Sequence, residues 1–428
     1  MQRVIMHIDM NSYFATVEQQ DNPDWRGKPL GVCEHLGGII IAASIEAKKW
    51  GIKTGTPVWE ARKLYPKIIL TKTHPDRYRL YTKRFLKVFG DYTDQIEKYS
   101  IDEAFVDVTK SCNIQVYKNN ELMWIDPFVE AERIGREIKQ RMKREVGDYI
   151  TCSIGIAWNK LVAKIGSDMQ KPDGLVTVRP QDKHQLYDKL SLTDIPGIAR
   201  RQEKNLAALG INTLADLRDY PASLLVQRFG ITGYHLHRMG QLEGSWKEEF
   251  DEEESIKSMG HMYTVSREHR KPGTLIPVLY KLSEMVGARL RVNGLSGNII
   301  HAYTRTLDDE SFGKSKKLGH YLNDGRDIFL ESRHILASLL SNKLEELSVT
   351  FVGVTVAGLS LHIEQKSLFA FDQKKQKVIP ALDAINEKYG DFTAARVPAF
   401  LARDIIRDSI GFGRMKEFKN LGNFKRGK

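Results

Sequence analysis

The 428-residue sequence has few cysteines and no long apolar run. Its three cysteines, Cys33, Cys112 and Cys152, are odd in number and far apart, which argues against a disulfide framework or a cysteine metal cluster and indicates a reducing compartment. No apolar run reaches the roughly 20 residues of a membrane span. The N-terminal segment MQRVIMHIDMNSYF also lacks the apolar core of a signal peptide. We therefore expect a cytoplasmic protein that has no membrane partner.

Positive charge is in excess, with 65 Lys and Arg against 54 Asp and Glu and a formal net charge of +11. Such a surplus attracts polyanions such as nucleic acids, although a merely basic soluble protein would have the same composition. The hydrophobic content of 41% and the charged content of 28% fit a globular protein. The length predicts two to four domains.

Apolar runs typical of strands alternate with helical patterns through residue 178, which predicts a layered α/β or α+β domain. Short helices separated by Gly and Pro are expected in residues 179–245, and the acidic residues 246–256 are typical of a linker. Residues 257–363 show a β-α-β-β-α-β pattern, and the basic tail that follows contains one expected helix, residues 377–390.

Two adjacent acids interrupt a pair of expected strands in YSIDEAFVDV, residues 99–108. Carboxylates are depleted in strands and like charges repel, so Asp102 and Glu103 are unexpected within a pair of strands. Asp9 ends another expected strand, and the three carboxylates can meet at one sheet edge if the strands are neighbours. Such oxygen ligands suit Mg²⁺, and two ions could support phosphoryl transfer. An ordinary solvated turn is the alternative, and we interpret Asp107 as structural.

Three segments, HIDMNSYFATVEQ, YSIDEAFVDVT and SIGIAWNKLVAKIGSDMQKPDG, resemble in order and spacing the signature segments of Y-family (translesion) DNA polymerases of the polymerase IV and UmuC type. The resemblance extends from residue 3 to at least residue 369. It implies an α+β multidomain fold shaped like a right hand. The implied parts are a mixed-sheet palm (1–20 and 80–178), fingers (21–79), a helical thumb (179–245), a linker (246–256), a β-α-β-β-α-β little finger that binds DNA (257–363), and a clamp-binding peptide with a tail (364–428).

By this resemblance, two Mg²⁺ ions, for which Mn²⁺ can substitute, activate the primer 3′-hydroxyl and neutralise the triphosphate of the incoming dNTP. Their ligands are the catalytic carboxylates of Asp9, Asp102 and Glu103 and the backbone carbonyl of Met10. The backbone amides of Tyr13 and Phe14 begin a helix, where free N–H groups suit phosphate. Phe14 also falls at the steric-gate position, where a ring would clash with a ribose 2′-hydroxyl. Plain core packing is the alternative for Phe14.

Lysines are expected at the triphosphate by the same resemblance. Lys171, in DMQKPDG, matches the family lysine that contacts the triphosphate, and Lys164 is a weaker candidate. In the fingers, polymerase IV usually has a Tyr-x-x-Arg pair, whereas this chain has Ile45 and Lys48 and is closer to the UmuC branch. Lys can neutralise a phosphate but cannot make the planar bidentate contact of Arg.

Basic residues in the thumb and little finger are expected to contact DNA phosphates without reading base sequence. Residues 195–211 resemble a helix-hairpin-helix, although Ala199 replaces its usual second glycine and a plain helical hairpin is the alternative. In the little finger, a solvated sheet face is the alternative for each residue. The expected contacts are Arg200, Arg201, Lys204, Lys257, Arg267, Arg270, Arg305, Lys314, Lys316 and Lys317.

QKSLF, residues 365–369, resembles the peptide that binds the bacterial sliding clamp. Its anchors would be Gln365, Leu368 and Phe369, which suit a groove on a partner. A strand end packed on the tail helix is the alternative.

Together these features predict a template-directed, low-fidelity DNA polymerase for translesion synthesis in DNA repair. We expect it to bind primer-template DNA and dNTPs as a monomer, near the bacterial nucleoid. One alternative is a catalytically inactive DNA- and clamp-binding protein on the same scaffold, which loss of the acidic ligands would mark, yet all three are present. Another is a nuclease or phosphatase, which would need neither a steric gate nor triphosphate lysines.

Overall fold

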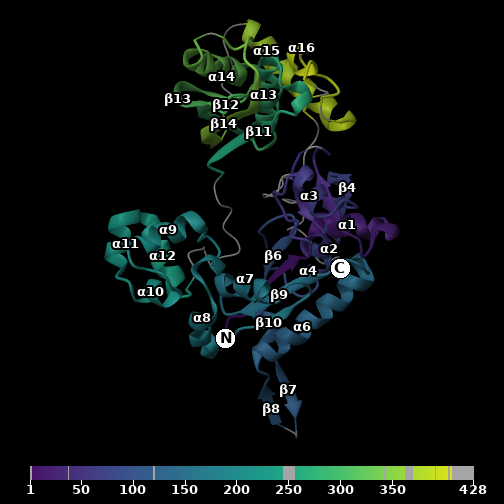
Figure 1. Ribbon diagram of the computed structural model, residues 1–428, viewed down its shortest axis with the longest axis vertical. Coiled ribbons are helices and arrows are strands. Elements are labelled where there is room, and N and C mark those ends of the chain that lie inside the picture. Colours follow the sequence, from purple (N-terminus) through teal and green to yellow (C-terminus); the bar gives the residue numbers. More distant parts are fainter. Residues whose placement is uncertain are drawn as a thin grey trace. The chain divides into compact units, whose positions relative to one another are not determined.

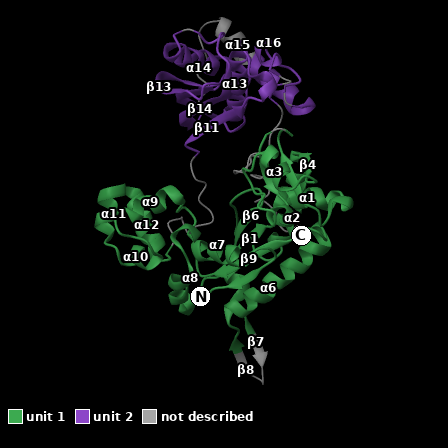
Figure 2. Ribbon diagram, viewed as in Figure 1, with its two compact units in different colours: residues 1–252, 409–428 green, residues 253–408 purple. Residues whose placement is uncertain are grey.

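The computed structural model describes residues 2–36, 38–118, 121–243, 256–341, 343–361, 370–390, 392–402 and 405–406. Residues 246–255 of the expected linker lie outside the described residues, as do Gln365, Leu368 and Phe369 of the expected clamp peptide. The chain divides into two compact units, unit 1 (residues 1–252 with 409–428) and unit 2 (residues 253–408), shown in Figure 2.

A five-stranded sheet forms the centre of the palm in unit 1 (Figure 1). In spatial order its strands are β10 (Leu175–Thr177), β9 (Cys152–Ala157), β1 (Ile5–Met10), β6 (Glu103–Asp107) and β5 (Ile96–Lys98). Helices α4 (Pro75–Gly90) and α6 (Pro127–Arg141) share a core with one face, and α7 (Lys160–Met169) packs on the other. Because both faces are covered, the central strands are almost continuously apolar.

Strand β1 divides its side chains between these two cores. Met6 and Ile8 lie in the core that includes α4 and α6, whereas Ile5 belongs to the core that includes α7. His7 and Asp9 have the same parity as Ile5, so they lie on the α7 side. A polar residue on this face therefore contacts α7 rather than the large aromatic core.

Gly155 lets α7 approach the sheet closely. A Cβ at this position would lie 2.0 Å from the carbonyl oxygen of Ala163, a separation that no side chain permits. Gly155 is the partner of His7 in the antiparallel pair of β1 and β9. The side chains of α7 are consequently brought within reach of His7.

The pairing of β1 with β6 brings the predicted carboxylates together. The two strands are antiparallel, and Asp9 lies opposite Glu103. The backbone N–H of Met10 donates to the carbonyl of Asp102 at 2.9 Å. The expectation that these segments are neighbours in one sheet is confirmed, and Asp102 lies in the turn immediately before β6.

The fingers contain a three-stranded sheet of β3 (Ile40–Ala43), β2 (Leu30–Cys33) and β4 (Ile69–Lys72). The helical elements beside it are α1 (Tyr13–Asp21), η1 (Pro23–Trp25), α2 (Ile45–Lys48) and α3 (Val58–Leu64). Glu46 ties α2 to the palm, because its carboxylate accepts hydrogen bonds from the Tyr149 hydroxyl at 3.0 Å and from the Gln19 amide at 3.2 Å. Helix α4 crosses the boundary between fingers and palm that we expected at residues 79 and 80.

The thumb is helical, and its core includes Ile5 and Phe105 of the palm sheet. Its elements are η3 (Pro180–Asp182), α8 (Lys183–Lys189), η4 (Leu192–Asp194), α9 (Arg200–Ala207), α10 (Leu214–Asp219), α11 (Ala222–Phe229) and α12 (Ile231–Gly240). The remaining elements of unit 1 are α5 (Thr109–Cys112), the π-helix η2 (Met142–Val146) and the hairpin strands β7 (Gln115–Lys118) and β8 (Glu121–Trp124). Figure 1 shows this hairpin projecting from the palm.

Unit 2 has a four-stranded antiparallel sheet in the order β11-β14-β12-β13, with the β-α-β-β-α-β sequence that we expected. Its elements are β11 (Ser258–Thr264), η5 (Arg267–His269), α13 (Leu275–Val292), β12 (Leu295–Thr306), β13 (Ser311–Leu322), α14 (Gly325–Leu339) and β14 (Val349–Leu361). Helices α13 and α14 pack together and against the sheet. The α+β multidomain fold class is thereby confirmed.

The tail continues in α15 (Ala370–Tyr389) and α16 (Val397–Phe400) and packs on unit 2. Arg291 of α13 makes a bidentate contact with Asp383 at 2.6 and 2.7 Å. Arg396 lies 2.8 Å from Glu284 and 2.7 Å from Asp324. The sequence predicted a helix here but not this docking. No described helix has the length and apolar character that crossing a bilayer requires.

Candidate active site

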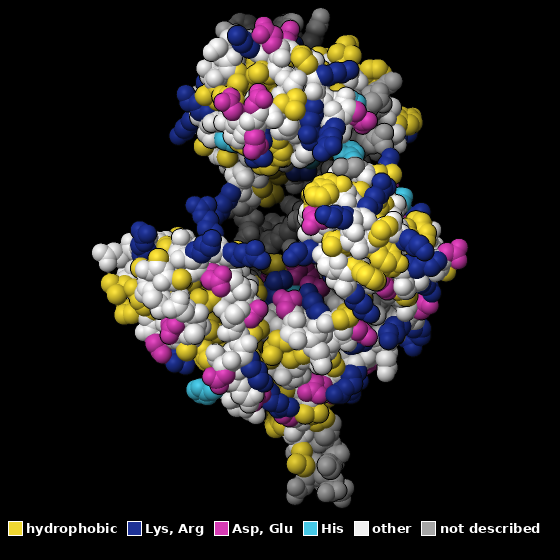
Figure 3. Space-filling model, viewed as in Figure 1, with side chains coloured by type: hydrophobic (Ala, Val, Ile, Leu, Met, Phe, Trp, Pro, Cys, Tyr) yellow, Lys and Arg dark blue, Asp and Glu magenta, His cyan; other side chains and the backbone are white. Residues whose placement is uncertain are grey.

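A cleft of about 590 Å³ lies between the palm and the fingers in unit 1. Its walls come from the end of β1, the start of α1, β3, α2, the turn before β6 and the loop after α7. The residues that line it are Asp9, Met10, Asn11, Ser12, Tyr13, Phe14, Ile41, Ala42, Ala43, Ile45, Lys48, Lys49, Thr54, Asp102, Lys171 and Pro172. Figure 3 shows Asp and Glu side chains in a hollow of unit 1, with Lys and Arg side chains around it.

Lys171 stands inside the acidic cluster. Its ammonium lies 3.0 Å from Oδ2 of Asp9 and 2.7 Å from Oδ1 of Asp168. Burial alone would lower the pKa of Lys171, but the two carboxylates outweigh burial and raise it. This ammonium therefore shows that a cation is stabilised beside Asp9.

Asp102 is the carboxylate whose charge is least well compensated. Burial raises the pKa of Asp102 to about 6, and the charges of Asp9 and Glu103 add to this, against a hydrogen bond from the Ser100 hydroxyl. The cluster therefore holds more negative charge than the nearby cations neutralise, and an additional cation would be stabilised there.

Glu103 is stabilised as an anion. Burial would raise its pKa, but a hydrogen bond from His7 and the charge of Lys164 lower the pKa of Glu103 to about 2. Nε2 of His7 lies 3.0 Å from Oε2 of Glu103, and Nζ of Lys164 contacts the same oxygen. Glu103 does not line the cleft itself. Lys164, our weaker triphosphate candidate, is paired with Glu103 rather than placed beside Lys171.

The acidic residues fit a divalent cation by their chemistry. Within the described ranges no three His, Cys, Asp or Glu side chains are arranged around a common metal position. Each carboxylate instead contacts a protein group: Lys171 for Asp9, Ser100 for Asp102, and His7 with Lys164 for Glu103. Hard oxygen donors with surplus negative charge are nevertheless the environment that Mg²⁺ prefers. The ammonium of Lys171 lies in this environment, in contact with Asp9 and Asp168.

Phe14 both lines the cleft and packs in the core. Its side chain is 2% exposed, and its ring stacks on Tyr78 with centroids 4.3 Å apart. Tyr13 is fixed beside it, because its hydroxyl donates to the carbonyl of Tyr78 at 2.7 Å. The two interpretations of Phe14 are thus compatible, since a ring held rigidly by its neighbours can limit the space in the cleft.

Helix α1 begins at the cleft with unusual cap geometry. Ser12 occupies the N-cap with a φ of 51° and makes no side-chain cap hydrogen bond. An α-helix leaves its first N–H groups without partners in the helix. The amides at Tyr13 and Phe14 are therefore placed where an anion in the cleft could accept from them.

Asn11 supports the Lys171 loop, a role that we did not predict. Its Oδ1 accepts hydrogen bonds from the backbone N–H of Asp173 at 2.8 Å and from the Thr151 hydroxyl at 3.0 Å. These bonds tie the loop that carries Lys171 to the end of β1. The only sequence signal was a polar residue two positions after Asp9 in the strand-to-helix segment.

Lys48 and Ile45 of α2 lie on the fingers side of the cleft. Burial and the charge of Lys171 lower the pKa of Lys48, and Asp9 opposes this change. Two nearby ammonium groups repel each other, so an anion that binds between them is stabilised by both charges. The cleft thus holds seven of the predicted residues together: Asp9, Met10, Tyr13, Phe14, Lys48, Asp102 and Lys171.

The predicted DNA contacts lie in the thumb and in unit 2. Arg200, Arg201 and Lys204 are exposed on α9, which follows a turn at Gly197 with a φ of 101°. In unit 2, Arg270 is half-buried and donates to the carbonyl of Val265 at 2.8 Å, and Lys316 lies 2.8 Å from Glu331. The side chains of Lys257, Arg267, Arg305, Lys314 and Lys317 are exposed.

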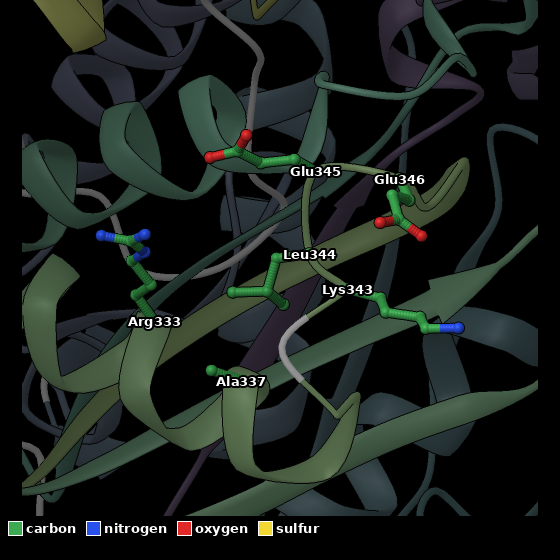
Figure 4. A pocket seen from close by; sticks show the side chains of 6 residues that line it. All are labelled: Arg333, Ala337, Lys343, Leu344, Glu345 and Glu346. Carbon is green, nitrogen blue, oxygen red and sulfur yellow. The ribbon is translucent and has the colours of Figure 1, made fainter.

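A second pocket, of about 350 Å³, lies at the end of α14 in unit 2 (Figure 4). Arg333, Lys343, Glu345 and Glu346 give it charges of both signs. Figure 4 shows Arg333 and Lys343 extending in opposite directions. A specific ligand site needs polar groups that converge, so this pocket is a poor candidate.

Comparisons with known proteins show the family to which the chain is related. Residues 8–168 match the impB/mucB/samB family, and residues 256–368 match the impB/mucB/samB family C-terminal domain. DNA polymerase IV of Moorella thermoacetica is 34% identical over 407 residues, which cover 94% of this chain and 97% of that protein. DNA polymerase IV 1 of Bacillus subtilis is 30% identical, covering 91% of each chain.

Two solved structures extend the likeness to three dimensions. The "Y-family DNA polymerase chimera Dbh-Dpo4(243-245)-Dbh" has a TM-score of 0.70 and 28% identity, covering 84% of this chain and 100% of that chain. The "Insertion ternary complex of Dbh DNA polymerase" has a TM-score of 0.55 and 27% identity, with the same coverage.

Proposed function

The chain belongs to the impB/mucB/samB family and is a Y-family DNA polymerase, and from this premise we propose how its cleft adds a dNTP to a primer during translesion synthesis. The observation that carries the proposal is the meeting, in one cleft, of Asp9 and Asp102 with Phe14 and two lysines. A nuclease or phosphatase would have no use for the ring and the lysines. An inactive scaffold would not need to keep the costly charges at Asp102.

In the proposal, Asp9, Asp102 and Glu103, with the carbonyl of Met10, hold two Mg²⁺ ions, or Mn²⁺ in their place. These ions, when bound, would supply charge neutralisation and lower the pKa of the primer 3′-hydroxyl. The protein's own contribution is position: β1 and β6 fix the carboxylates on adjacent strands, so little rearrangement is needed during the reaction.

The triphosphate would be bound from three sides. Lys171 exchanges its carboxylate partners for phosphate oxygens, and Lys48 approaches from the fingers. The amides at the start of α1, at Tyr13 and Phe14, donate to the same anion. Phe14 lies beneath the sugar, where its ring leaves no room for a 2′-hydroxyl and so selects dNTPs.

DNA would be held by sequence-independent phosphate contacts from the thumb and the little finger. We assign palm, fingers, thumb, linker and little finger to the residue ranges expected from the sequence. Phosphate contact without base readout suits an enzyme that must accept any template. We also propose that residues 365–369 bind the sliding clamp, and that the enzyme acts as a monomer in the bacterial cytoplasm at the nucleoid.

Primer extension with Mg²⁺ and either dNTPs or rNTPs tests the central proposal. Asp102→Asn should lower incorporation by at least about 1,000-fold, because it removes a charge at the reacting centre. Its matched control is Asp107→Asn, on the same strand, which contacts Arg3 and the N–H of Thr109 instead of the cleft. Normal incorporation by Asp102→Asn, or equal loss in both variants, would contradict the assignment. DNA shortening without dNTPs would favour the nuclease.

A further inference from the structure

The carboxylate of Glu103 is contacted on one oxygen only. Nε2 of His7 lies 3.0 Å from Oε2, and Nζ of Lys164 contacts that same Oε2. Among the described residues no hydrogen bond is made to Oε1. We propose that His7, supported by Ser167, is a positioning residue that holds Glu103 with its second oxygen left for the metal. This inference rests on the proposed role of Glu103 as a metal ligand.

The sheet places His7 directly behind Glu103. His7 lies two residues before Asp9 on β1 and opposite Phe105 of β6, which itself lies two residues after Glu103. The imidazole is fully buried, and its centroid is 4.6 Å from that of the Phe105 ring. Packing from both strands therefore fixes the direction in which Nε2 points.

Ser167 completes a chain of hydrogen bonds that ends at the carboxylate. Its Oγ lies 2.7 Å from Nδ1 of His7 and 2.8 Å from the carbonyl of Lys164. The Ser167 hydroxyl has a single proton, so it donates either to the Lys164 carbonyl or to His7; when the ring donates from Nε2 to Glu103, Nδ1 is the acceptor that can take this proton. Mutation of a residue that orients a metal ligand in this way typically lowers metal affinity or activity by about 10- to 100-fold.

Lys164 contributes positive charge beside Glu103 but does not fix the orientation of the carboxylate. Its ammonium lies 4.9 Å from the centroid of the Tyr99 ring, which helps to hold it beside Glu103. An ammonium has three rotatable donors and can follow a carboxylate that turns. The imidazole cannot follow, because Phe105 packs against it and Ser167 holds its other nitrogen. Loss of His7 should therefore release the orientation of Glu103 even when Lys164 is present.

A purely structural His7 would give a different result, and Met6 provides the matched control. Met6 is the neighbouring residue on β1, is fully buried, and belongs to the core on the opposite face. Met6→Val removes buried volume without touching a carboxylate. His7→Leu removes both hydrogen bonds, whereas His7→Gln keeps an N–H that can reach Glu103.

The experiment measures Mn²⁺ binding without turnover, by electron paramagnetic resonance. It uses the full chain with a dideoxy-terminated primer-template and a non-hydrolysable dNTP. His7→Leu should weaken Mn²⁺ affinity about tenfold, the usual lower bound for a residue that orients a ligand. His7→Gln should recover most of the affinity, and Met6→Val should bind as the wild type does. DNA affinity should be equal in all four proteins, and the Mg²⁺ concentration for half-maximal incorporation should rise only in His7→Leu.

Unchanged Mn²⁺ affinity in His7→Leu, or an equal loss in Met6→Val, would overturn the inference. If His7→Leu does not fold, a wild-type affinity in the folded variant Ser167→Ala would overturn it as well. Glu103→Gln separates this inference from the proposed function. Unchanged Mn²⁺ binding in Glu103→Gln would refute Glu103 as a ligand, whereas loss there combined with none in His7→Leu would refute only the positioning by His7.

Discussion

Charged residues of the palm and of unit 2 differ in burial and in spacing. In the palm, Asp9 and Glu103 lie on adjacent strands and Asp102 lies in the turn before β6, and burial, together with the charges of Asp9 and Glu103, raises the pKa of Asp102. In unit 2, Arg305, Lys314 and Lys317 stand exposed along the sheet. Charges in a low-dielectric site interact strongly, whereas exposed charges are screened by water and salt. One substitution should therefore matter greatly in the palm and little in unit 2.

After the loss of incorporation expected for Asp102→Asn, the next largest effect is expected from Phe14 in the wall of the cleft. Phe14→Ala should lower the preference for dNTPs over rNTPs by on the order of 100-fold, because the space for a 2′-hydroxyl opens. The measurement is kcat/KM for each nucleotide in single-nucleotide primer extension. Tyr81→Phe, which removes a hydroxyl that donates to Asp21 away from the cleft, is the control. Unchanged selectivity in Phe14→Ala would mean that the ring is only a core residue.

The next prediction tests whether the buried negative charge of Asp102 lowers the free energy of unfolding. Burial raises the pKa of Asp102 to about 6, above the ordinary carboxyl value of 3.8. The folded protein therefore holds this proton more tightly, and the contribution of Asp102 to the free energy of unfolding falls as the pH rises from about 4 to 6. Asp102→Asn should then be more stable than the wild type at pH 7, by about 1–3 kcal/mol.

Thermal melting of both proteins in metal-free buffer, followed from pH 4 to pH 8, measures this difference. It should grow up to about pH 6, the folded pKa, and then level off. A variant that melts below the wild type at pH 7 would show that Asp102 is already compensated. In that case the comparison between the palm and unit 2 would lose its electrostatic basis.

A moderate effect is expected for the lysines that share the cleft. Lys171→Met should raise KM for the dNTP about tenfold or more, because a hydrogen bond to a charged group is lost. Lys48→Met should also raise KM for the dNTP, since Lys48 lines the cleft from the fingers side. Steady-state kinetics at saturating DNA give both values. Lys49→Met, in the same cleft wall, shows whether any lysine there has the same effect.

The smallest effect is expected in unit 2. Lys314→Ala or Lys317→Ala should weaken DNA binding only about two- to threefold, and each should reduce the slope of log affinity against log salt by about 1. Fluorescence anisotropy with two unrelated duplexes at several salt concentrations measures this. Loss confined to one duplex would indicate base readout instead of phosphate contact. A tenfold loss from either variant would remove the contrast with the palm.

Local sequence patterns predicted much of the fold and part of the candidate site. The apolar run that ends at Asp9 and the strand residues of YSIDEAFVDV predicted β1 and β6, because such composition is local information. That these strands are neighbours was a condition of the predicted site, and the structure meets it. The first of the two helices expected in the β-α-β-β-α-β pattern of residues 257–363 is α13 (Leu275–Val292). The order of elements in unit 2 likewise followed from spacing alone.

Other features depend on contacts between residues far apart in the chain. Ser167 and His7 are 160 residues apart, and Asn11 and Asp173 are 162 apart. Neither pair has a local signature, since a serine in a helix or an asparagine after a strand has many ordinary uses. The docking of the tail through Arg291 and Asp383 could not be predicted from the sequence for the same reason.

The docked tail has a mechanical consequence. Strand β14 ends at Leu361 and helix α15 begins at Ala370, and both belong to unit 2. The nine chain steps between these residues reach at most about 30 Å when extended. A partner that binds this segment would therefore be held by a short tether, both ends of which are attached to unit 2. A force on that partner would be transmitted to unit 2 through both ends of the segment, at β14 and at α15.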